Sequence, residues 1–143
     1  MDTTNNSNRT ILLIDDDSIA NLISTKVIEM TSNFNVISIT HSSQALESLR
    51  QWSTISDVTF PEIIFLDVNM PVMNGWEFLD EFQKFPESIL DKCKVYMLSS
   101  SIDPRDMQKS KLYKCVQEFI SKPLTEEKLE TITNAEFVFK GSK

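Results

Sequence analysis

Five polar side chains in this sequence follow short apolar runs and could together carry out chemistry on a phosphoryl group. Asp15 and Asp16 follow one run, and Asp67, Ser99 and Lys122 each follow or closely follow another. Grouped carboxylates suit a hard divalent cation such as Mg²⁺, and a carboxylate beside that ion can accept a phosphoryl group as an aspartyl phosphate. A hydroxyl and an ammonium group would then neutralise charge on the transferred oxygens.

Each of these residues also has an ordinary structural explanation when it is taken alone. Asp15 or Asp17 could cap a helix, and for Asp17 we favour that role. Asp67 could be a turn residue, a serine at a strand end is common, and an isolated lysine is usually a solvated surface residue. His41 has no partner at metal-ligand spacing and is interpreted as a loop residue. The functional interpretation depends on four strand ends that each offer a suitable group.

The elements that would position these groups alternate along the chain. Continuous apolar runs predict buried strands at 11–14 and 63–66, and further strands are predicted at 36–39, 95–98 and 118–120. Helical spacing of apolar residues predicts helices that begin near 17–18, 42–43, 76, 103–104 and 125. The first helix carries its apolar residues at Ile19, Leu22, Ile23, Val27 and Met30, and Asn74-Gly75 is interpreted as a turn.

Five strand–helix units predict an α/β fold, with an open, doubly wound parallel sheet and helices on both faces. Ligands of such sheets bind outside the carboxyl ends of the strands. The strand order 2-1-3-4-5 would bring all the polar strand ends together there. Glycine occurs only at 75 and 141, so a glycine-rich phosphate loop is absent, which excludes Rossmann-type and P-loop nucleotide sites.

Length and composition limit the remaining possibilities. The 143 residues suit one domain, predicted at 9–138, between a mobile polar tail at 1–8 and a C-terminal tail at 139–143. A net charge of −7 argues against binding to nucleic acid or anionic membranes. No apolar run approaches a membrane span, and the polar start shows no signal peptide, so we expect a cytoplasmic protein. Cys93 and Cys115 are expected to be reduced, packed thiols.

Four stretches of the sequence together resemble the response-regulator receiver domain of two-component signalling. They read ILLIDDDS, IIFLDVNMPVMNGWEFL, YMLSSS and FISKPLT, and the resemblance runs from about Arg9 to Ile132. The combination of LDVNMPVMNG with an upstream DD pair and a downstream SKP is highly specific. The resemblance implies a flavodoxin-like sheet of order 2-1-3-4-5 and a phosphoacceptor that controls partner binding.

The resemblance also implies a role for each motif residue. Asp67 matches the phosphoacceptor, Asp16 a direct Mg²⁺ ligand, and Asp15 the acid that holds a metal-bound water. The backbone carbonyl of Asn69 would be a further ligand. The remaining matches are Ser99 as the switch hydroxyl, Lys122 as the phosphate-binding lysine, Pro123 as a cis-proline and Phe119 as the switch aromatic. A tyrosine is frequent at the last position, so Phe119 lacks a hydroxyl that could bond outward.

Partners and mode of action follow from the same resemblance. The phosphoryl group would come from a histidine kinase or a histidine phosphotransfer protein. The output would be read by a protein target on the surface formed by the helix at 103–114, the strand at 118–120 and the last helix. The chain ends soon after that helix, so we expect a stand-alone receiver that turns over no external substrate and is not an enzyme in that sense.

Two alternatives from other classes remain open at this point. The first is an Mg²⁺-dependent phosphatase of the haloacid-dehalogenase type. It would place the nucleophile before the acidic pair, and it needs a second acid where this chain has Asn69. The second is an adaptor that works without phosphorylation, although a complete set of five polar groups argues against it.

Overall fold

The computed structural model describes residues 9–55, 60–101 and 103–141, and its centre is a five-stranded sheet in which all pairs are parallel. The strands are β1 (Thr10–Ile14), β2 (Asn35–Ile39), β3 (Ile63–Asp67), β4 (Lys94–Ser99) and β5 (Val116–Ser121). They lie in the order β2-β1-β3-β4-β5, which confirms the predicted order. The order changes direction beside β1 and β3, so the carboxyl ends of these two strands form the switch point of the sheet.

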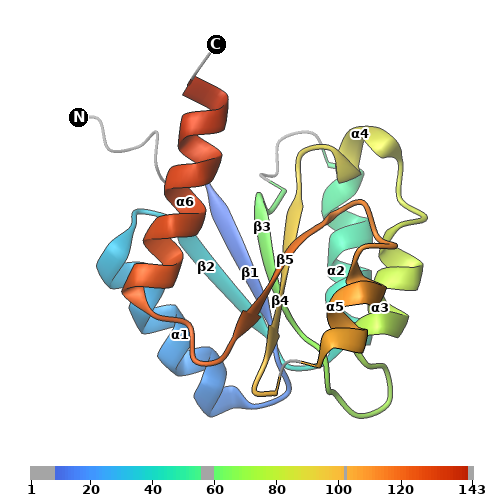
Figure 1. Cartoon of the computed structure of the whole chain (residues 1–143). Coiled ribbons are helices and arrows are strands. Elements are labelled where there is room, and N and C mark those ends of the chain that lie inside the picture. The colour runs from blue at the N-terminus through green and yellow to red at the C-terminus, as the bar shows by residue number, and fades with distance from the viewer. Residues whose placement is uncertain (1–8, 56–59, 102, 142–143) are drawn as a thin grey trace.

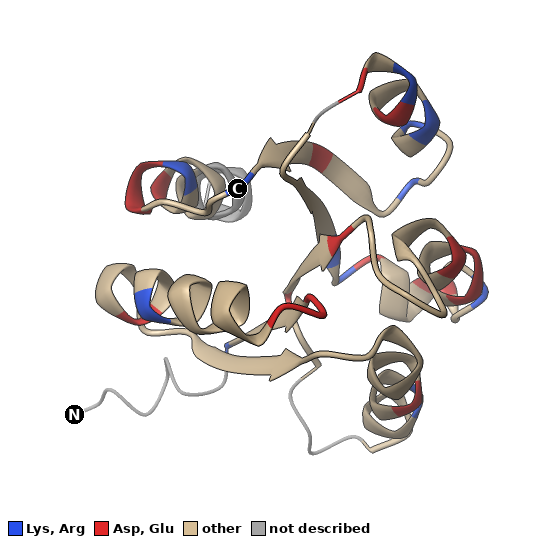
Figure 2. Ribbon diagram, turned by 90° about the horizontal axis from the view of Figure 1, so that it is seen from below, with Lys and Arg blue, Asp and Glu red and all other residues tan. Residues whose placement is uncertain are grey.

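Helices cover both faces of this sheet. They are α1 (Ser18–Thr31), α2 (Ser42–Ser53), α3 (Gly75–Phe82), α4 (Glu87–Leu90), α5 (Pro104–Ser110) and α6 (Glu126–Gly141). Helices α1 and α6 lie side by side on one face, and α2, α3 and α5 lie on the other (Figures 1 and 2). The doubly wound α/β architecture is therefore confirmed.

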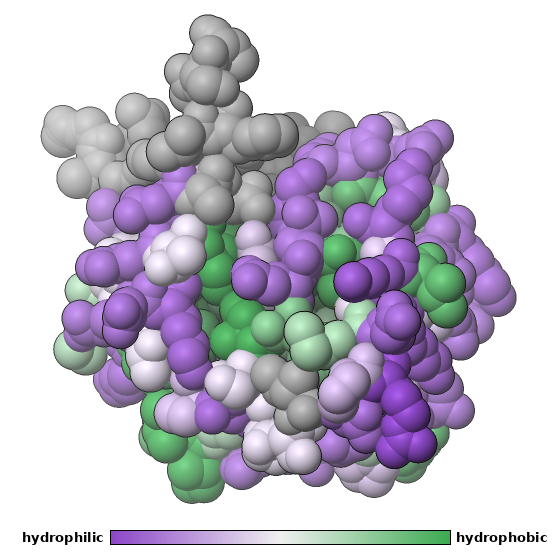
Figure 3. Space-filling model, in the orientation of Figure 1, coloured by the Kyte–Doolittle hydropathy of each residue, from purple (hydrophilic) through white to green (hydrophobic). Residues whose placement is uncertain are grey.

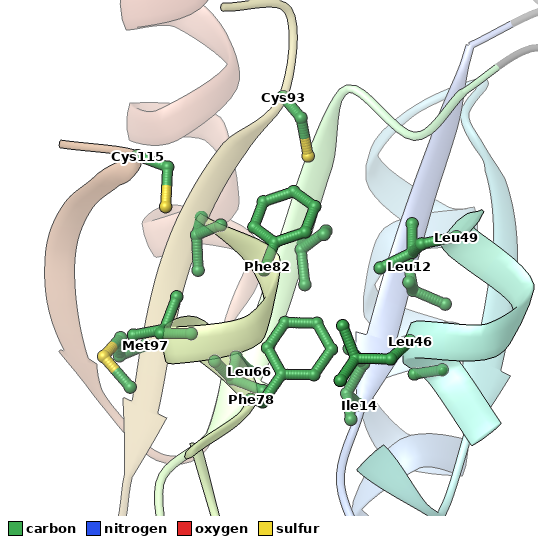
Figure 4. Close-up of a cluster of buried hydrophobic side chains, with 14 of the residues drawn as sticks. Leu12, Ile14, Leu46, Leu49, Leu66, Phe78, Phe82, Cys93, Met97 and Cys115 are labelled. Carbon is green, nitrogen blue, oxygen red and sulfur yellow. The ribbon is translucent and has the colours of Figure 1, made fainter. Parts of the chain in front are cut away.

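Two apolar cores fill the space between the sheet and its helices. All five residues of β1 and all five of β3 are buried, as expected for strands covered on both faces. On the α2–α3 side, Phe78 and Phe82 of α3 point between the sheet and Leu46 of α2 (Figure 4). On the α1–α6 side, Ile28 and Leu129 pack against the alternate side chains of the same strands.

The two cysteines belong to the first of these cores. Cys93 and Cys115 are free and buried, which confirms the prediction of packed thiols, and Figure 4 shows both side chains directed toward the apolar cluster. Burial raises the pKa of the Cys115 thiol to about 11, so this thiol is protonated and unreactive at neutral pH. Among the described residues, no helix combines the length and the apolar character that crossing a bilayer would require.

Helix α1 presents its apolar residues to solvent rather than to the core. Ile19, Leu22, Ile23 and Met30 are between 51% and 72% exposed. The buried side of the helix carries Asn21, Ser24 and Ile28 instead. The helical spacing predicts the helix correctly, but the face that packs on the sheet is a largely different one. Figure 3 shows hydrophobic surface at the lower left, over the N-terminal part of α1.

Local details differ from the sequence prediction at three further places. A short helix, α4, lies between α3 and β4, where none is predicted. Asn74 caps α3 instead of forming a turn, through a reciprocal capping box with Glu77. His41, interpreted from the sequence as a loop residue, is the N-cap of α2 but makes no side-chain capping bond, and the Ser42 hydroxyl donates to the carbonyl of Met73.

The domain limits stay predictions. The predicted tail at 1–8 lies outside the described residues. Helix α6 is described to Gly141, which is beyond the predicted boundary at 138.

Candidate functional site

Three carboxylates meet where β1 and β3 end. One oxygen from each of Asp15, Asp16 and Asp67 can be chosen so that all three lie within 4.8 Å of one another. Asp15 and Asp67 are each only 5% exposed, whereas Asp16 is exposed. Figure 2 looks at this edge of the sheet and shows the acidic loop between β1 and α1 near the middle of the molecule. The order of the strands thus brings together acids that lie 51 residues apart or more in the sequence.

The loop between β1 and α1 is held by its own hydrogen bonds. The amide of Asp15 donates to the Ile39 carbonyl of β2, and the side-chain amide of Asn21 donates to the Asp15 carbonyl at 2.9 Å. The Asp15 carboxylate accepts the amide of Asp17, and the Asp17 carboxylate accepts the amides of Ile19 and Ala20. Asp17 is therefore the N-cap of α1, as predicted, and its carboxylate points into the helix start.

Lys122 lies beside two of the three carboxylates. Its Nζ is 2.7 Å from Asp15 Oδ2 and 3.3 Å from Asp67 Oδ1. The backbone fixes this position, because the Lys122 amide donates to the Ser99 carbonyl at the end of β4. Lys128 of α6 adds a second support by donating to the carbonyls of Ser121 and Pro123. The Lys122–Pro123 peptide bond is cis.

These contacts set the electrostatics of the site. Burial, followed by the neighbouring charge of Asp15, raises the pKa of Asp67 to about 6, although Lys122 and the backbone of Asn69 act in the opposite direction. Burial also lowers the pKa of Lys122, but the bond to Asp15 and the charges of Asp15 and Asp67 outweigh it and leave that pKa raised. The ammonium group of Lys122 is therefore charged at neutral pH. The surroundings of Asp67 make its ionised form less stable than that of an ordinary aspartate.

Ser99 is buried at the end of β4, but its hydroxyl does not join the acidic cluster. It is 1% exposed, its hydroxyl donates to the Ser101 carbonyl at 2.8 Å, and it accepts the Ser101 amide at 3.1 Å. The predicted contact with a phosphoryl group therefore requires the hydroxyl to leave Ser101. Because β3 and β4 are neighbours, Ser99 lies on the strand next to Asp67.

Two other predicted site residues, Asn69 and Phe119, lie on opposite sides of β4. Asn69 is exposed in the segment after β3, and its backbone hydrogen-bonds the Asp67 carboxylate. Phe119 of β5 is half-buried, and its ring centroid is 6.2 Å from that of Trp76. Phe119 is therefore next to the aromatic core and belongs to the far side of β4 from the acids.

The start of α3 is part of the site, which the sequence argument missed. The Gly75 amide donates to the Val68 carbonyl, and a Cβ at Gly75 would lie only 2.7 Å from the Asp67 carbonyl oxygen. Only glycine, which has no Cβ, lets α3 begin so close to Asp67. The rarity of glycine in this chain was the available signal, because Gly75 is one of two.

The donor set of the acidic cluster fits a hard divalent cation. Lys122 contacts Asp15 and Asp67 and can neutralise only one of the three carboxylate charges, and the charge of Asp15 adds to burial in raising the pKa of Asp67. Carboxylate oxygens are the ligands that Mg²⁺ takes, together with water. The cluster can therefore hold Mg²⁺, with exposed Asp16 at the open side.

Comparison with known proteins finds the same family that the sequence motifs resemble. A family model described as the response regulator receiver domain matches residues 11–134. The structure resembles a two-component response regulator from Cytophaga hutchinsonii, with 37% identity, a TM-score of 0.82, and coverage of 90% of this chain and 96% of that one. No curated protein matches the chain.

Two more distant structures share the fold. A response regulator receiver protein from Dyadobacter fermentans has 22% identity and a TM-score of 0.77, covering 90% of this chain and 98% of that one. A receiver domain protein from Methanospirillum hungatei has 22% identity and a TM-score of 0.71, covering 95% and 99%.

Proposed function

The chain belongs to the response regulator receiver domain family, and we propose that Asp67 is the residue that accepts the phosphoryl group. The family function is that of a phosphoacceptor in two-component signalling, and the acidic pocket fits it. The observation that supports Asp67 most directly is its position. It ends the central strand β3, it is 5% exposed, and it lies 3.3 Å from Lys122. Neither of the other acids combines these features.

The proposed reaction is a direct transfer. An Oδ of ionised Asp67 attacks the phosphorus of the donor, and a new P–O bond forms. The bond from phosphorus to the donor's leaving atom breaks, and its electron pair stays with that atom. Lys122 stabilises the negative charge of the phosphoryl oxygens from its place between Asp15 and Asp67.

Asp15, Asp16 and the Asn69 carbonyl are the proposed metal-binding groups, together with Asp67 itself. When bound, Mg²⁺ would offset the charge of the carboxylates and of the incoming phosphoryl group. Asp15 is held by Lys122 and by the Asp17 amide, which leaves exposed Asp16 free to contact the ion directly. Without the cation, two buried carboxylates and a phosphoryl group would repel one another.

Intact-mass measurement tests the assignment of Asp67. We expect the wild-type chain to gain one phosphoryl group after treatment with acetyl phosphate and Mg²⁺, and Asp67→Asn to gain none. Asp17→Asn is the matched control, because an asparagine caps a helix as well as an aspartate, and it should label like wild type. Labelling of Asp67→Asn at the wild-type rate would contradict the assignment.

A second measurement tests the metal ligands. We expect Mg²⁺ to shift the amide resonances around Asp16 and Asp67 with weak affinity, since water fills much of its coordination shell. Asp16→Ala should lose this response, and Asp17→Asn should keep it. An unchanged Mg²⁺ titration in Asp16→Ala would remove that residue from the ligand set.

The same preparations separate the two alternative functions. A phosphatase of the haloacid-dehalogenase type would hydrolyse a phosphomonoester such as p-nitrophenyl phosphate repeatedly, whereas we expect no turnover. A phosphorylation-independent adaptor would show no labelling by acetyl phosphate.

The proposed phosphodonor is a histidine kinase or a histidine phosphotransfer protein. Exposed Ile19, Leu22 and Ile23 start one turn beyond the acidic loop, so a protein that reaches the buried Asp67 would meet them. Apolar side chains beside a polar site suit contact with another protein.

The proposed output surface is formed by α5, β5 and α6, where Met107 is 45% exposed and Leu112, just after α5, is 78% exposed. With a net charge of −7, we expect protein targets in the cytoplasm and no tight DNA binding at ~200 mM salt.

A further inference from the structure

An aromatic cluster lies on the α3 side of the sheet, between α3, α5 and β5. Trp76 of α3 stacks on Tyr113 with ring centroids 5.9 Å apart, and it contacts Phe119 of β5 at 6.2 Å. Lys109 of α5 places its ammonium group over the Trp76 ring, 4.8 Å from the centroid. Trp76 is 9% exposed. One side chain of α3 therefore contacts three separate parts of the proposed output side of the molecule.

The backbone next to Trp76 is in contact with the phosphorylation site. The Gly75 amide bonds the Val68 carbonyl at 2.9 Å, and Gly75 itself packs against the Asp67 carbonyl oxygen too closely for a side chain. Protein interiors transmit displacement because they are densely packed. A change at Asp67 or Val68 therefore reaches the first turn of α3 directly.

The far end of the cluster is also tied back to α3. The Tyr113 hydroxyl donates to Asp80 Oδ1 at 2.7 Å, and Tyr113 is 8% exposed. Trp76 and Asp80 lie one turn apart on α3, so they hold Tyr113 from the same helix. The position of the Trp76 ring is thus fixed from α3, from the turn after α5 and from β5.

We propose that Trp76 is a positioning residue for Phe119 and couples the Asp67 site to the α5–β5 surface through α3. In the arrangement described here, the Ser99 hydroxyl is bonded to Ser101 and the Phe119 ring packs on Trp76. The Trp76–Phe119 contact stabilises this arrangement. When Ser99 turns to the phosphoryl group and Phe119 moves, that contact is lost. This inference rests on the proposed function of Asp67.

The chain carries an internal control for the test. It has two tryptophans, and Trp52 lies on α2, outside this cluster. The indole N–H resonance of each tryptophan can be assigned with Trp52→Phe, which retains only Trp76. We expect beryllofluoride with Mg²⁺ to shift the Trp76 indole resonance in wild type and in Trp52→Phe, and to leave the Trp52 resonance in place.

A variant measures the coupling itself. The Trp76–Phe119 contact belongs to the arrangement in which the Ser99 hydroxyl is bonded to Ser101. Trp76→Leu should therefore favour the arrangement in which Ser99 turns to the phosphoryl group. Linkage then requires tighter binding of the phosphoryl mimic. We expect the beryllofluoride concentration at half-saturation to fall about 2- to 10-fold, the range that one aromatic pair supplies. Trp52→Phe should leave it unchanged.

The outcomes distinguish this inference from the proposed function. If beryllofluoride shifts no amides around Asp67, the proposed function fails. If it shifts those amides and those of residues 103–122 but leaves the Trp76 indole in place, only the role of Trp76 is wrong. A half-saturation concentration in Trp76→Leu equal to or above that of wild type would also overturn it. The indole measurement on Trp52→Phe decides the matter even if Trp76→Leu does not fold.

Discussion

At the scale of single residues, the three acids of the site differ in what surrounds them. Asp15 and Asp67 are equally buried, but Asp15 has the shorter contact with Lys122, at 2.7 Å against 3.3 Å. Asp16 is exposed. Burial and the charge of Asp15 raise the pKa of Asp67 to about 6, so it is ionised at neutral pH and protonated under mildly acidic conditions. An ionised Asp67 is what nucleophilic attack on phosphorus requires.

This environment predicts how Asp67 titrates in metal-free protein. Lys122→Ala removes a group that lowers the pKa of Asp67, so we expect that pKa to rise above 6. Asp15→Asn removes a charge that raises it, so we expect it to fall. Carbon-13 NMR of the carboxyl groups, with Asp67→Asn to assign the signal, measures both shifts. Changes in the opposite directions would mean that another group dominates the field at Asp67.

At the scale of elements, α3 determines how the site connects to the rest of the fold. Its N-terminus is closed by the capping box of Asn74 and Glu77, in which each side chain bonds the other residue's amide at 2.9 Å. Gly75 then brings the helix against the end of β3. In the preceding segment, Val72 has a left-handed backbone with φ 70°, although it is β-branched, and its side chain is 98% exposed.

The close approach of α3 predicts a large effect of a small substitution. A Cβ at Gly75 would meet the Asp67 carbonyl oxygen at 2.7 Å, and backbone cannot move aside as a flexible side chain can. We expect Gly75→Ala to lower the free energy of unfolding by on the order of 1–3 kcal/mol. Urea denaturation measures this, with Ser43→Ala in the exposed first turn of α2 as control. A stability equal to wild type would show that α3 can move away at little cost.

Val72 predicts an effect of the opposite sign. Left-handed backbone costs a β-branched residue more than it costs asparagine, and a 98% exposed side chain loses no burial when it is replaced. We expect Val72→Asn to raise the free energy of unfolding by about 1 kcal/mol. Leu112→Asn, at another exposed apolar residue, should give no such gain. If both variants change stability equally, the backbone at Val72 is not the cause.

At the scale of the whole molecule, the site and the proposed output surface are joined across β4 and β5. Ser99 ends β4, Phe119 is paired with Met97 in the sheet register, and the Lys122 amide bonds the Ser99 carbonyl. The Ser99 hydroxyl donates to the Ser101 carbonyl in this arrangement, so its reorientation would exchange that bond for one to the phosphoryl group. A hydrogen bond to a charged oxygen contributes about 1.5–3 kcal/mol against about 1 kcal/mol for a neutral one, and the difference favours the reoriented state once Asp67 carries a phosphoryl group.

Removal of the Ser99 hydroxyl should therefore separate labelling from its distant effect. We expect Ser99→Ala to accept a phosphoryl group on Asp67 and to lose most of the amide shift changes that beryllofluoride causes at residues 103–122. Backbone NMR with and without the mimic measures this, and Ser101→Ala, which keeps the Ser99 hydroxyl, should retain them. If Ser99→Ala shows the full wild-type pattern, Ser99 is not coupled to Phe119 and does not transmit the signal.

Apart from the short helix α4, the sequence by itself determines the order and type of the elements, and it also determines the chemistry at the strand ends. Continuous apolar runs identify β1 and β3, and the acids that follow them identify the edge where a cation and a phosphoryl group can bind. These features are local, because each strand or helix carries its own pattern of apolar residues. Asp17 as the cap of α1 is predicted correctly for the same reason.

The tertiary structure alone decides which surfaces and atoms meet. Periodicity identifies the apolar stripe of α1 but not whether that stripe faces the sheet or the solvent. Asn21 bonds the Asp15 carbonyl and Ile28 enters the core. Because these residues fix the buried side of the helix, Ile19 and Leu22 face solvent. Likewise, the Ser99 hydroxyl turns to Ser101 rather than to the acids. Burial and hydrogen bonding depend on neighbours that are distant in the sequence. A local pattern therefore cannot determine them before the sheet has brought those neighbours together.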